Sequence, residues 1–294
     1  MPSAEVNSTP NMPDKHSAMS GLAKRVVTGS ILAMIVVATT LALPSFWFAL
    51  MVAAFVLVGA WEWSGMAGWP SLTQRLAYSA GLLPVLVAVA ALGRSQAGMW
   101  AILLAGLVWW LVALAWVVRA QQGLAVDALN HGPVRVLSGW MILAPSWAAV
   151  SYLHSAAEFG PWLVLYLVFL IAAADTGAYF VGRRFGRHRL ASKVSPSKSL
   201  EGVAGGLLAV ATFAISVALL ADFAEPLAFL VLSLITALVS ILGDLTESVV
   251  KRRAGLKDSG SIVPGHGGIL DRIDSVTAAA PIFVLGCLWQ GNVL

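Results

Sequence analysis

Long apolar stretches with almost no charge run through this chain of 294 residues, and they limit its possible folds more than any other feature. A helix that crosses a membrane needs about 20 mostly apolar residues, because lipid offers no hydrogen-bond partners to an open backbone. Hydrophobic residues make up 59% of the chain and charged residues only 11%, whereas soluble domains carry about 25% charged residues. The sequence therefore predicts an all-α fold, a polytopic integral membrane helical bundle.

Hydropathy places nine candidate transmembrane helices. They cover residues 26–43, 46–64, 76–93, 98–118, 135–153, 161–181, 200–220, 226–246 and 269–289. The first twenty residues are polar and have no periodicity, so we predict a disordered tail over residues 1–22. We expect N-terminal transmembrane helices over residues 23–155. A C-terminal transmembrane region over residues 156–294 is expected to hold the chemistry.

Lys and Arg residues gather on one side of this predicted topology. With the N-terminus inside, all but two of the 18 fall in cytoplasmic segments, and two dense clusters lie at residues 183–198 and 251–257. The exceptions are Arg94, in an outer loop, and Arg272, at the start of the last span. By the positive-inside rule we predict a cytoplasmic N-terminus and a C-terminus outside. Both clusters could also serve only to orient the protein and attract anionic lipid.

Acidic side chains lie beside the second basic cluster. Asp244 falls near the inner end of the eighth span, and Asp271 and Asp274 fall in the first turns of the ninth. Ionisable groups at membrane depth are costly and usually mark a site, and residues three apart share a helix face. Carboxylates within a basic shell suit Mg²⁺ that arrives with substrate phosphates. Each carboxylate could instead pair with a neighbouring charge or complement a helix dipole.

A glycine-rich turn, PGHGG, leads into the last span. Gly267 and Gly268 let the backbone approach a ligand closely, and the first N–H groups of the following helix can bind an anion. His266 lies in the same turn and could contact a phosphate, transfer a proton, or simply bond to the backbone at the helix entry. No Walker A sequence occurs, so we expect no P-loop nucleotide site.

A family resemblance rests on residues 248–274, which read SVVKRRAGLKDSGSIVPGHGGILDRID. This stretch resembles the signature of the phosphatidate cytidylyltransferases, also called CDP-diacylglycerol synthases. The positions that match in register are Ser248, Lys251, Arg252, Lys257, Asp258, His266, Gly267, Gly268, Asp271, Arg272 and Asp274. DTGAYFVGRRFGRH from Asp175, SPSKSLEG from Ser195 and the pair Glu62–Trp63 are also similar to the family. Two positions depart from its pattern, since serines replace the usual Lys at residue 197 and Thr at residue 199.

The resemblance implies a nucleotidyltransferase of phospholipid biosynthesis that converts CTP and phosphatidate into CDP-diacylglycerol and pyrophosphate. It implies Mg²⁺ or Mn²⁺ held by Asp244, Asp271 and Asp274, and it leaves an additional monovalent cation open. Further catalytic residues would be Lys251, Asp258 and His266. The substrate-binding residues would be Ser195, Lys198, Glu201, Ser248, Arg252, Lys257, Gly267, Gly268 and Arg272. The role of Asp175 stays open.

The same resemblance implies a homodimer in the bacterial inner membrane, with membrane lipid and no nucleic acid as a partner. Two other classes of protein remain as alternatives. One is a transporter of an anionic solute, although such proteins commonly place their charges near the bilayer midplane. The other is a different membrane nucleotide-dependent lipid enzyme, such as a polyprenol kinase. CDP-alcohol phosphotransferases have a characteristic Asp spacing that does not occur here.

Overall fold

A computed structural model of the protein describes residues 29–31, 33–156, 159–262 and 267–291. The chain forms two compact units, Met1–Ala38 and Thr39–Leu294. In the first unit, the described residues belong to a short apolar helix, Gly29–Ala42, which ends in the second unit. All elements discussed below lie in the second unit.

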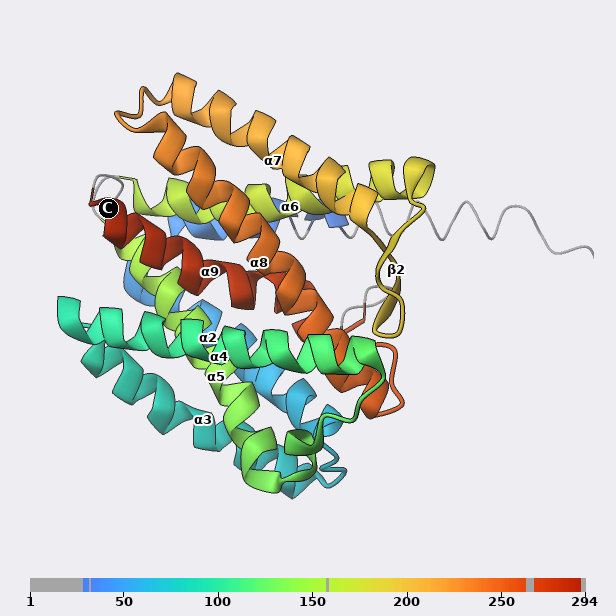
Figure 1. The fold of residues 1–294 in the computed structure, drawn as a ribbon. Helices are drawn as coiled ribbons and strands as arrows, with labels where there is room; N and C mark the ends of the chain where they lie inside the picture. Colours follow the sequence, from blue (N-terminus) through green and yellow to red (C-terminus); the bar gives the residue numbers. More distant parts are fainter. Residues whose placement is uncertain (1–28, 32, 157–158, 263–266, 292–294) are drawn as a thin grey trace, which may run out of the picture. The chain divides into compact units, whose positions relative to one another are not determined.

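Eight helices in the described chain are long and apolar enough to cross a membrane. They are α2 (Ser45–Met66), α3 (Leu72–Leu92), α4 (Gln96–Gln122), α5 (Gly132–Ser155), α6 (Gly160–Phe185), α7 (Leu200–Leu220), α8 (Pro226–Arg253) and α9 (Leu270–Gln290) (Figure 1). The predicted all-α membrane bundle is confirmed, and eight of the nine predicted spans coincide with these helices. The first predicted span, residues 26–43, overlaps the shorter helix and lies partly outside the described residues.

The largest difference from the predicted boundaries is at the end of α8. The apolar pattern ends at residue 246, but the helix continues to Arg253. Val249 and Val250 in this extension are buried, so packing holds it against the bundle. Its last turn carries Lys251 and two arginines, whose positive charges complement the C-terminal end of a helix dipole. The first part of the signature-like stretch is therefore helical.

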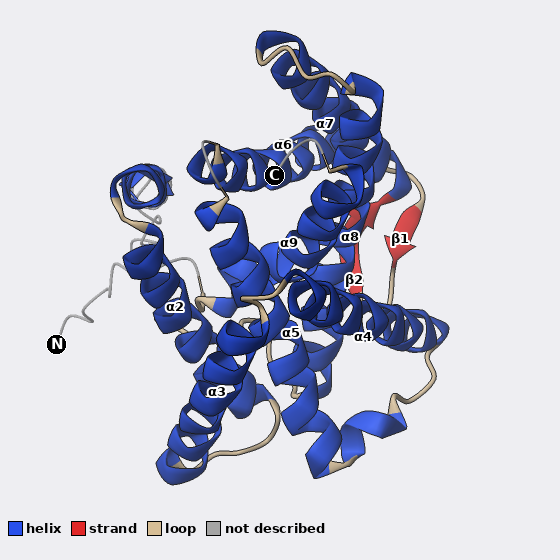
Figure 2. Ribbon diagram, turned by 90° about the vertical axis from the view of Figure 1, so that its left-hand side faces the viewer, coloured by secondary structure: helices blue, strands red, loops and turns tan. Residues whose placement is uncertain are grey.

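A β-hairpin joins α6 to α7. Its strands are β1 (Arg189–Ala191) and β2 (Ser195–Ser199), paired antiparallel and drawn in red in Figure 2. Ser199 ends the hairpin and starts α7, because its hydroxyl accepts a hydrogen bond from the Gly202 N–H at 3.1 Å. The first basic cluster, residues 183–198, therefore lies on the end of α6 and on this hairpin. A short 3₁₀ helix, η1 (Asp127–Asn130), lies between α4 and α5.

Small residues bring neighbouring helices close together at positions where the helices carry polar groups. A Cβ atom on Gly177 of α6 would lie 2.6 Å from the carbonyl oxygen of Gly205 on α7, so only glycine permits this approach. Gly243 of α8 does the same for α9, since a Cβ atom there would overlap the carbonyl oxygen of Asp274. This second contact places the acidic residues of α8 and α9 side by side.

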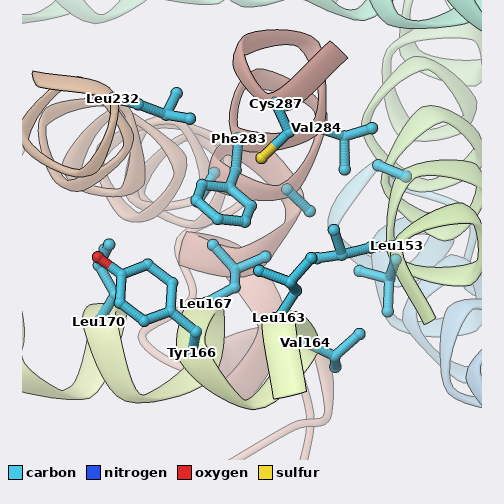
Figure 3. Packing of buried hydrophobic residues seen from close by; sticks show 14 of the residues in the cluster. Leu153, Leu163, Val164, Tyr166, Leu167, Leu170, Leu232, Phe283, Val284 and Cys287 are labelled. Carbon is cyan, nitrogen blue, oxygen red and sulfur yellow. The ribbon is translucent and has the colours of Figure 1, made fainter. Parts of the chain in front are cut away.

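One buried apolar cluster lies mainly among α5, α6, α8 and α9, and a second lies mainly among α2, α3, α4 and α5. Leu167, Leu170 and Phe283 are almost completely buried, and Figure 3 shows them with the free cysteine Cys287. The hydroxyl of Tyr166 and that of Ser233 lie 2.6 Å apart, which satisfies both polar groups inside the core. This part of the bundle supports the helices that carry the polar site.

Consecutive helices run in opposite directions, so alternate connections meet at the same end of the bundle. Figure 1 shows β2 and the C-terminal ends of α4 and α8 together on the right-hand side. The connections at this end cover residues 67–71, 123–131, 186–199 and 254–269. Both basic clusters therefore lie at one end, as the predicted topology requires.

Candidate active site

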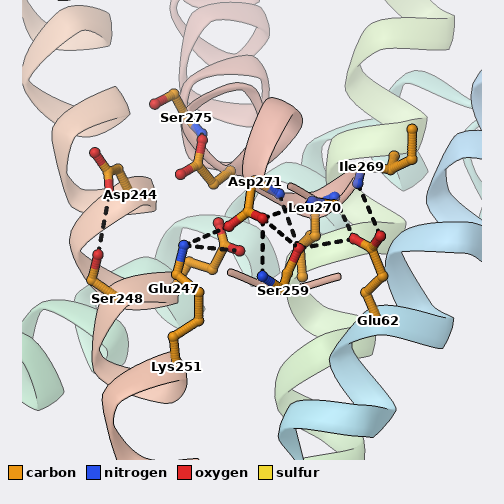
Figure 4. A network of polar contacts seen from close by, with 12 residues as sticks. Glu62, Asp244, Glu247, Ser248, Lys251, Ser259, Ile269, Leu270, Asp271 and Ser275 are labelled. Carbon is orange, nitrogen blue, oxygen red and sulfur yellow. Dashed lines mark hydrogen bonds and ion pairs between the residues drawn. The ribbon is translucent and has the colours of Figure 1, made fainter. Parts of the chain in front are cut away.

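Asp271 is the centre of a polar network at this end of the bundle (Figure 4). Its Oδ1 atom lies 2.6 Å from Nζ of Lys251, which reaches it from the last turns of α8. Its Oδ2 atom accepts hydrogen bonds from the Gly268 N–H at 2.8 Å and the Ser259 N–H at 2.9 Å. A carboxylate with donors on both oxygens is held in one orientation.

The turn that enters α9 depends on Gly267. Its φ angle is +82°, in the left-handed region that residues with a side chain seldom adopt. A Cβ atom at this position would also lie 2.6 Å from Oδ2 of Asp271. The prediction was a close approach of the Gly267 backbone to a ligand, and in the structure the group that it approaches is the Asp271 carboxylate. His266, predicted in the same turn, lies outside the described residues.

Two more carboxylates, those of Glu247 and Asp274, lie near the ion pair between Asp271 and Lys251. Glu247 is only 4% exposed, and its Oε1 atom lies 3.5 Å from Nζ of Lys251. Neither of its carboxylate oxygens has a hydrogen-bond partner among the described residues. Asp274 lies close enough to Glu247 and Asp244 for their charges to interact. Such crowding of negative charge is unfavourable unless cations are near.

Lys198 brings a second cation to these carboxylates from the hairpin. Its Nζ atom lies 2.5 Å from Oδ2 of Asp244. The other oxygen of Asp244 accepts a hydrogen bond from the Ser248 hydroxyl at 3.3 Å. The structure therefore joins the SPSKSLEG stretch to the signature-like stretch, although the two are separated by all of α7 and most of α8.

Glu201 and Arg252 are not brought to the carboxylates by any described contact. Glu201 accepts hydrogen bonds from the Arg187 and His188 N–H groups, and its Oε1 lies 2.6 Å from Nδ1 of His188. It thus fixes the entry to the hairpin. Arg252 lines a separate cavity of 550 Å³ with Lys193 and Arg253, beside the end of α4.

Four other predicted residues make no hydrogen bond or ion pair through their side chains within the described part of the chain. They are Ser195, Lys257, Asp258 and Arg272, and the last three are exposed. Gly268, by contrast, donates its N–H to Asp271. The three exposed side chains come from the segment before α9 and from its first turn.

The acidic side chains have the right chemistry for a hard divalent cation. Among the described residues, no three Asp, Glu, His or Cys side chains form a group that could hold a metal ion, and Lys198 and Lys251 lie against two of the predicted ligands. The donors are nevertheless all oxygens, and the Glu247 oxygens are buried without hydrogen-bond donors. Carboxylate oxygens are the protein ligands that Mg²⁺ prefers. The side chains present are therefore of the chemical type that binds Mg²⁺.

Glu62 and Ser259 belong to the network but, like Glu247, were not among the predicted site residues. Glu62 of α2 is 1% exposed, and its carboxylate accepts a hydrogen bond from the Ser259 hydroxyl at 2.9 Å. The same hydroxyl lies 3.0 Å from Oδ2 of Asp271. A charged residue inside an apolar span was the signal that could have identified Glu62.

The chain is similar to known proteins over most of its length. The model of a family described as "Cytidylyltransferase family" matches residues 23–288. The chain belongs to the cytidylyltransferase family. A relative from Pseudomonas aeruginosa named phosphatidate cytidylyltransferase is 40% identical over 273 residues, which cover 92% of this chain and 98% of that protein.

Two further relatives carry the same name. The one from Haemophilus influenzae is 36% identical over 89% of this chain and 97% of its own length. The one from Bacillus subtilis is 42% identical over 42% of this chain. The predicted family resemblance is confirmed, and it extends over the N-terminal spans of this cytidylyltransferase as well as over the signature-like stretch.

Proposed function

We propose that this cytidylyltransferase makes CDP-diacylglycerol and pyrophosphate from CTP and phosphatidate for phospholipid biosynthesis. A phosphate oxygen of phosphatidate attacks the α-phosphorus of CTP. The bond from that phosphorus to the oxygen bridging the α- and β-phosphates breaks, and pyrophosphate leaves. The observation that carries the proposal is the meeting of the hairpin, α8 and α9 in one cluster of carboxylates and lysines, which suits two polyanionic substrates.

Cations of the chain reduce the repulsion between these substrates. Lys251 and Lys198 lie in the carboxylate cluster and can turn to phosphate oxygens when substrates enter, because long lysine side chains reorient easily. A divalent cation, Mg²⁺ or Mn²⁺, would be held by Asp244, Asp271 and Asp274, with Glu247 beside them. When bound, it would offset phosphate charge and stabilise charge on the leaving pyrophosphate.

A cavity beside Lys198 supports phosphatidate as the lipid substrate. It has a volume of 510 Å³ and lies between α6, α7, α8 and the hairpin. Arg183, Arg189 and Lys198 line its polar part, and apolar side chains such as Leu207 and Ile241 line the rest. This distribution matches a lipid with an anionic headgroup and acyl chains.

The direct test uses the purified protein in detergent with CTP and phosphatidate. We expect CDP-diacylglycerol and pyrophosphate in equal amounts, and no product when a chelator removes divalent cations. Product from CTP and a polyprenol, or no lipid-linked cytidylate at all, would reject the proposal. Restoration of activity by added Mg²⁺ or Mn²⁺ distinguishes metal removal from loss of the folded protein.

The site faces the cytoplasm of a bacterial inner membrane, where CTP is available. The asymmetry of Lys and Arg supports this orientation, with the N-terminus cytoplasmic and the C-terminus outside. Single cysteines at Arg187 and Arg94, both exposed and at opposite ends of the bundle, test it in a Cys287→Ser background. In intact cells an impermeant reagent should label position 94 and not position 187. Labelling of position 187 and not of position 94 would mean that the protein has the opposite orientation in the membrane.

The protein works as a homodimer, as the family resemblance implies. The mass of the protein in detergent, corrected for bound detergent, should correspond to two chains of 30.8 kDa each. A single chain with full activity would contradict the dimer and leave the proposed reaction intact.

A further inference from the structure

A carboxylate from the N-terminal half of the chain touches the backbone that enters α9. Oε1 of Glu62 accepts a hydrogen bond from the Ile269 N–H at 3.0 Å, and Oε2 accepts one from the Leu270 N–H at 2.7 Å. These residues are separated by more than 200 positions in the chain. In Figure 4, Glu62 lies at the right-hand end of the network, where its carboxylate reaches from α2 to Ile269 and Leu270 at the start of α9.

The Glu62 carboxylate supplies the hydrogen-bond acceptors that the first N–H groups of α9 would otherwise lack. The first N–H groups of a helix have no partner within the helix, and the residue before it usually caps them with a side-chain oxygen. Here that residue is Ile269, which makes no such bond. A negative charge at a helix N-terminus is also favoured by the helix dipole. Glu62 therefore caps α9 from another helix.

Ser259 connects this cap to Asp271. Its hydroxyl donates to Oε2 of Glu62 at 2.9 Å and accepts from the Asp271 N–H at 3.3 Å. Its own N–H donates to Oδ2 of Asp271. Displacement of Glu62 would therefore disturb Ser259, which bonds both to the Asp271 backbone N–H and to the Asp271 carboxylate.

Two glycines leave room for the Glu62 carboxylate. A Cβ atom on Gly260 would lie 2.5 Å from Oε1 of Glu62, and a Cβ atom on Gly268 would overlap both the Glu62 carboxylate and the Ser259 hydroxyl. Both glycines thus let the chain close around a carboxylate that lies almost out of reach of solvent. Such an arrangement fixes the angle at which α9 presents its first turn.

We propose that Glu62 is a positioning residue of this enzyme, which holds the entry to α9 and, through Ser259, orients Asp271 toward Lys251 and the substrates. The inference rests on the proposed function for its catalytic consequence. It gives α2, whose role the sequence left open, a part in the reaction. The Glu62 carboxylate is occupied by hydrogen bonds from Ser259, Ile269 and Leu270, so its effect on the reaction is indirect.

The experiment compares Glu62→Gln with Ser64→Ala. The glutamine keeps the shape of the side chain but places an NH₂ group where one of the two α9 N–H groups needs an acceptor. Ser64 is equally buried on the same helix, but its hydroxyl donates only to the Trp61 carbonyl oxygen. It therefore controls for a polar change in α2 away from the network.

Two readouts separate positioning from folding. In amide hydrogen exchange, Glu62→Gln should speed exchange of the first turn of α9 by roughly 10-fold or more while the rest of the bundle stays protected. In kinetics it should lower kcat by about 10- to 100-fold, as loss of a partner that orients a site residue commonly does. KM for CTP should change little. Ser259→Ala should lower kcat in the same direction, and the double variant should lose less than the product of the two single effects.

Unchanged exchange in α9 with unchanged kcat would overturn the proposal, as would equal effects of Glu62→Gln and Ser64→Ala. Uniformly faster exchange over all helices would mean that Glu62 only supports the fold. If the wild-type protein makes no CDP-diacylglycerol, the proposed function fails, whereas the exchange comparison still decides whether Glu62 holds α9.

Discussion

Nζ of Lys198 lies 2.5 Å from Oδ2 of Asp244, so an ion pair fastens the hairpin to the inner part of α8. The two side chains are about one quarter to one third exposed, and Lys198 lines the 510 Å³ cavity. Lys198 therefore lies between this cavity on one side and the carboxylate cluster on the other. A phosphate that entered from either direction would meet the same ammonium group.

The first prediction follows from this position. Lys198→Ala should lower kcat/KM by roughly 10- to 150-fold, because a hydrogen bond to a charged group contributes about 1.5–3 kcal/mol and 1.4 kcal/mol corresponds to a factor of ten. Steady-state kinetics with CTP and phosphatidate, at matched protein levels, measures the loss. Ser197→Ala is the control, since Ser197 also lines the cavity but carries no charge. Similar small losses in both variants would limit Lys198 to holding the hairpin.

The second prediction concerns the acidic residues that would hold the divalent cation. Asp271→Asn and Asp274→Asn should each lower turnover by two orders of magnitude or more, on the scale of about 2.7–4 kcal/mol seen when one electrostatic group at a reacting centre is lost. Turnover is measured over a range of Mg²⁺ concentrations. Asp127→Asn in the exposed η1 should behave like the wild type. Near-normal turnover of either variant at limiting Mg²⁺ would remove that residue from the ligand set.

The helices and the polar cluster could be predicted from sequence for different reasons. A span such as α7 is predictable because lipid demands a long apolar segment whatever packs against it. Asp271 and Asp274 were predictable as a pair because helix geometry puts residues three apart on one face. In both cases the physical cause acts within a short stretch of chain.

The contacts that were missed depend on packing between distant segments. Nothing near Glu62 in sequence indicates that its partners are the N–H groups of Ile269 and Leu270. Arg252 is adjacent to Lys251, yet the two point to different sides of α8, and hydropathy does not say which side faces α9. The hairpin was also missed, because strands of 3 and 5 residues are too short for a recognisable alternation of apolar and polar side chains.

The third prediction concerns Lys251 and Arg252, whose side chains point to different sides of α8. Lys251 contacts Asp271 and Glu247, so Lys251→Ala leaves buried carboxylates without their cation and should nearly abolish product formation. Arg252 lines the cavity beside α4, and Arg252→Ala should cost less. CTP-dependent kinetics on both variants makes the comparison. An equal, severe loss in both would return Arg252 to the phosphate-binding role that the family resemblance implies.

Arg253 is not a neutral control for these two residues. It donates hydrogen bonds to the Val126 carbonyl oxygen at 3.0 Å and to the side-chain oxygen of Asn130. Arg253→Ala should therefore leave chemistry nearly intact but loosen the connection between α4 and α5. A lowered melting temperature with normal kcat is the expected combination.

The last prediction tests the turn into α9 with two glycines that share a backbone conformation. Gly267 and Gly255 both have positive φ angles, +82° and +70°, so alanine is strained at either position by about the same amount. Their surroundings differ. A Cβ atom on Gly267 would lie 2.6 Å from Oδ2 of Asp271, whereas one on Gly255 would have nothing within 4 Å.

Gly267→Ala should therefore displace the Asp271 carboxylate and lower kcat by about 10- to 100-fold, as expected when the orientation of a site residue is lost. Gly255→Ala should lower stability slightly and leave kcat close to normal. Kinetics and thermal unfolding in the same detergent measure both effects for both variants. If the two alanine variants lose activity equally, backbone strain explains the loss, and the close approach of Gly267 to Asp271 has no part in catalysis.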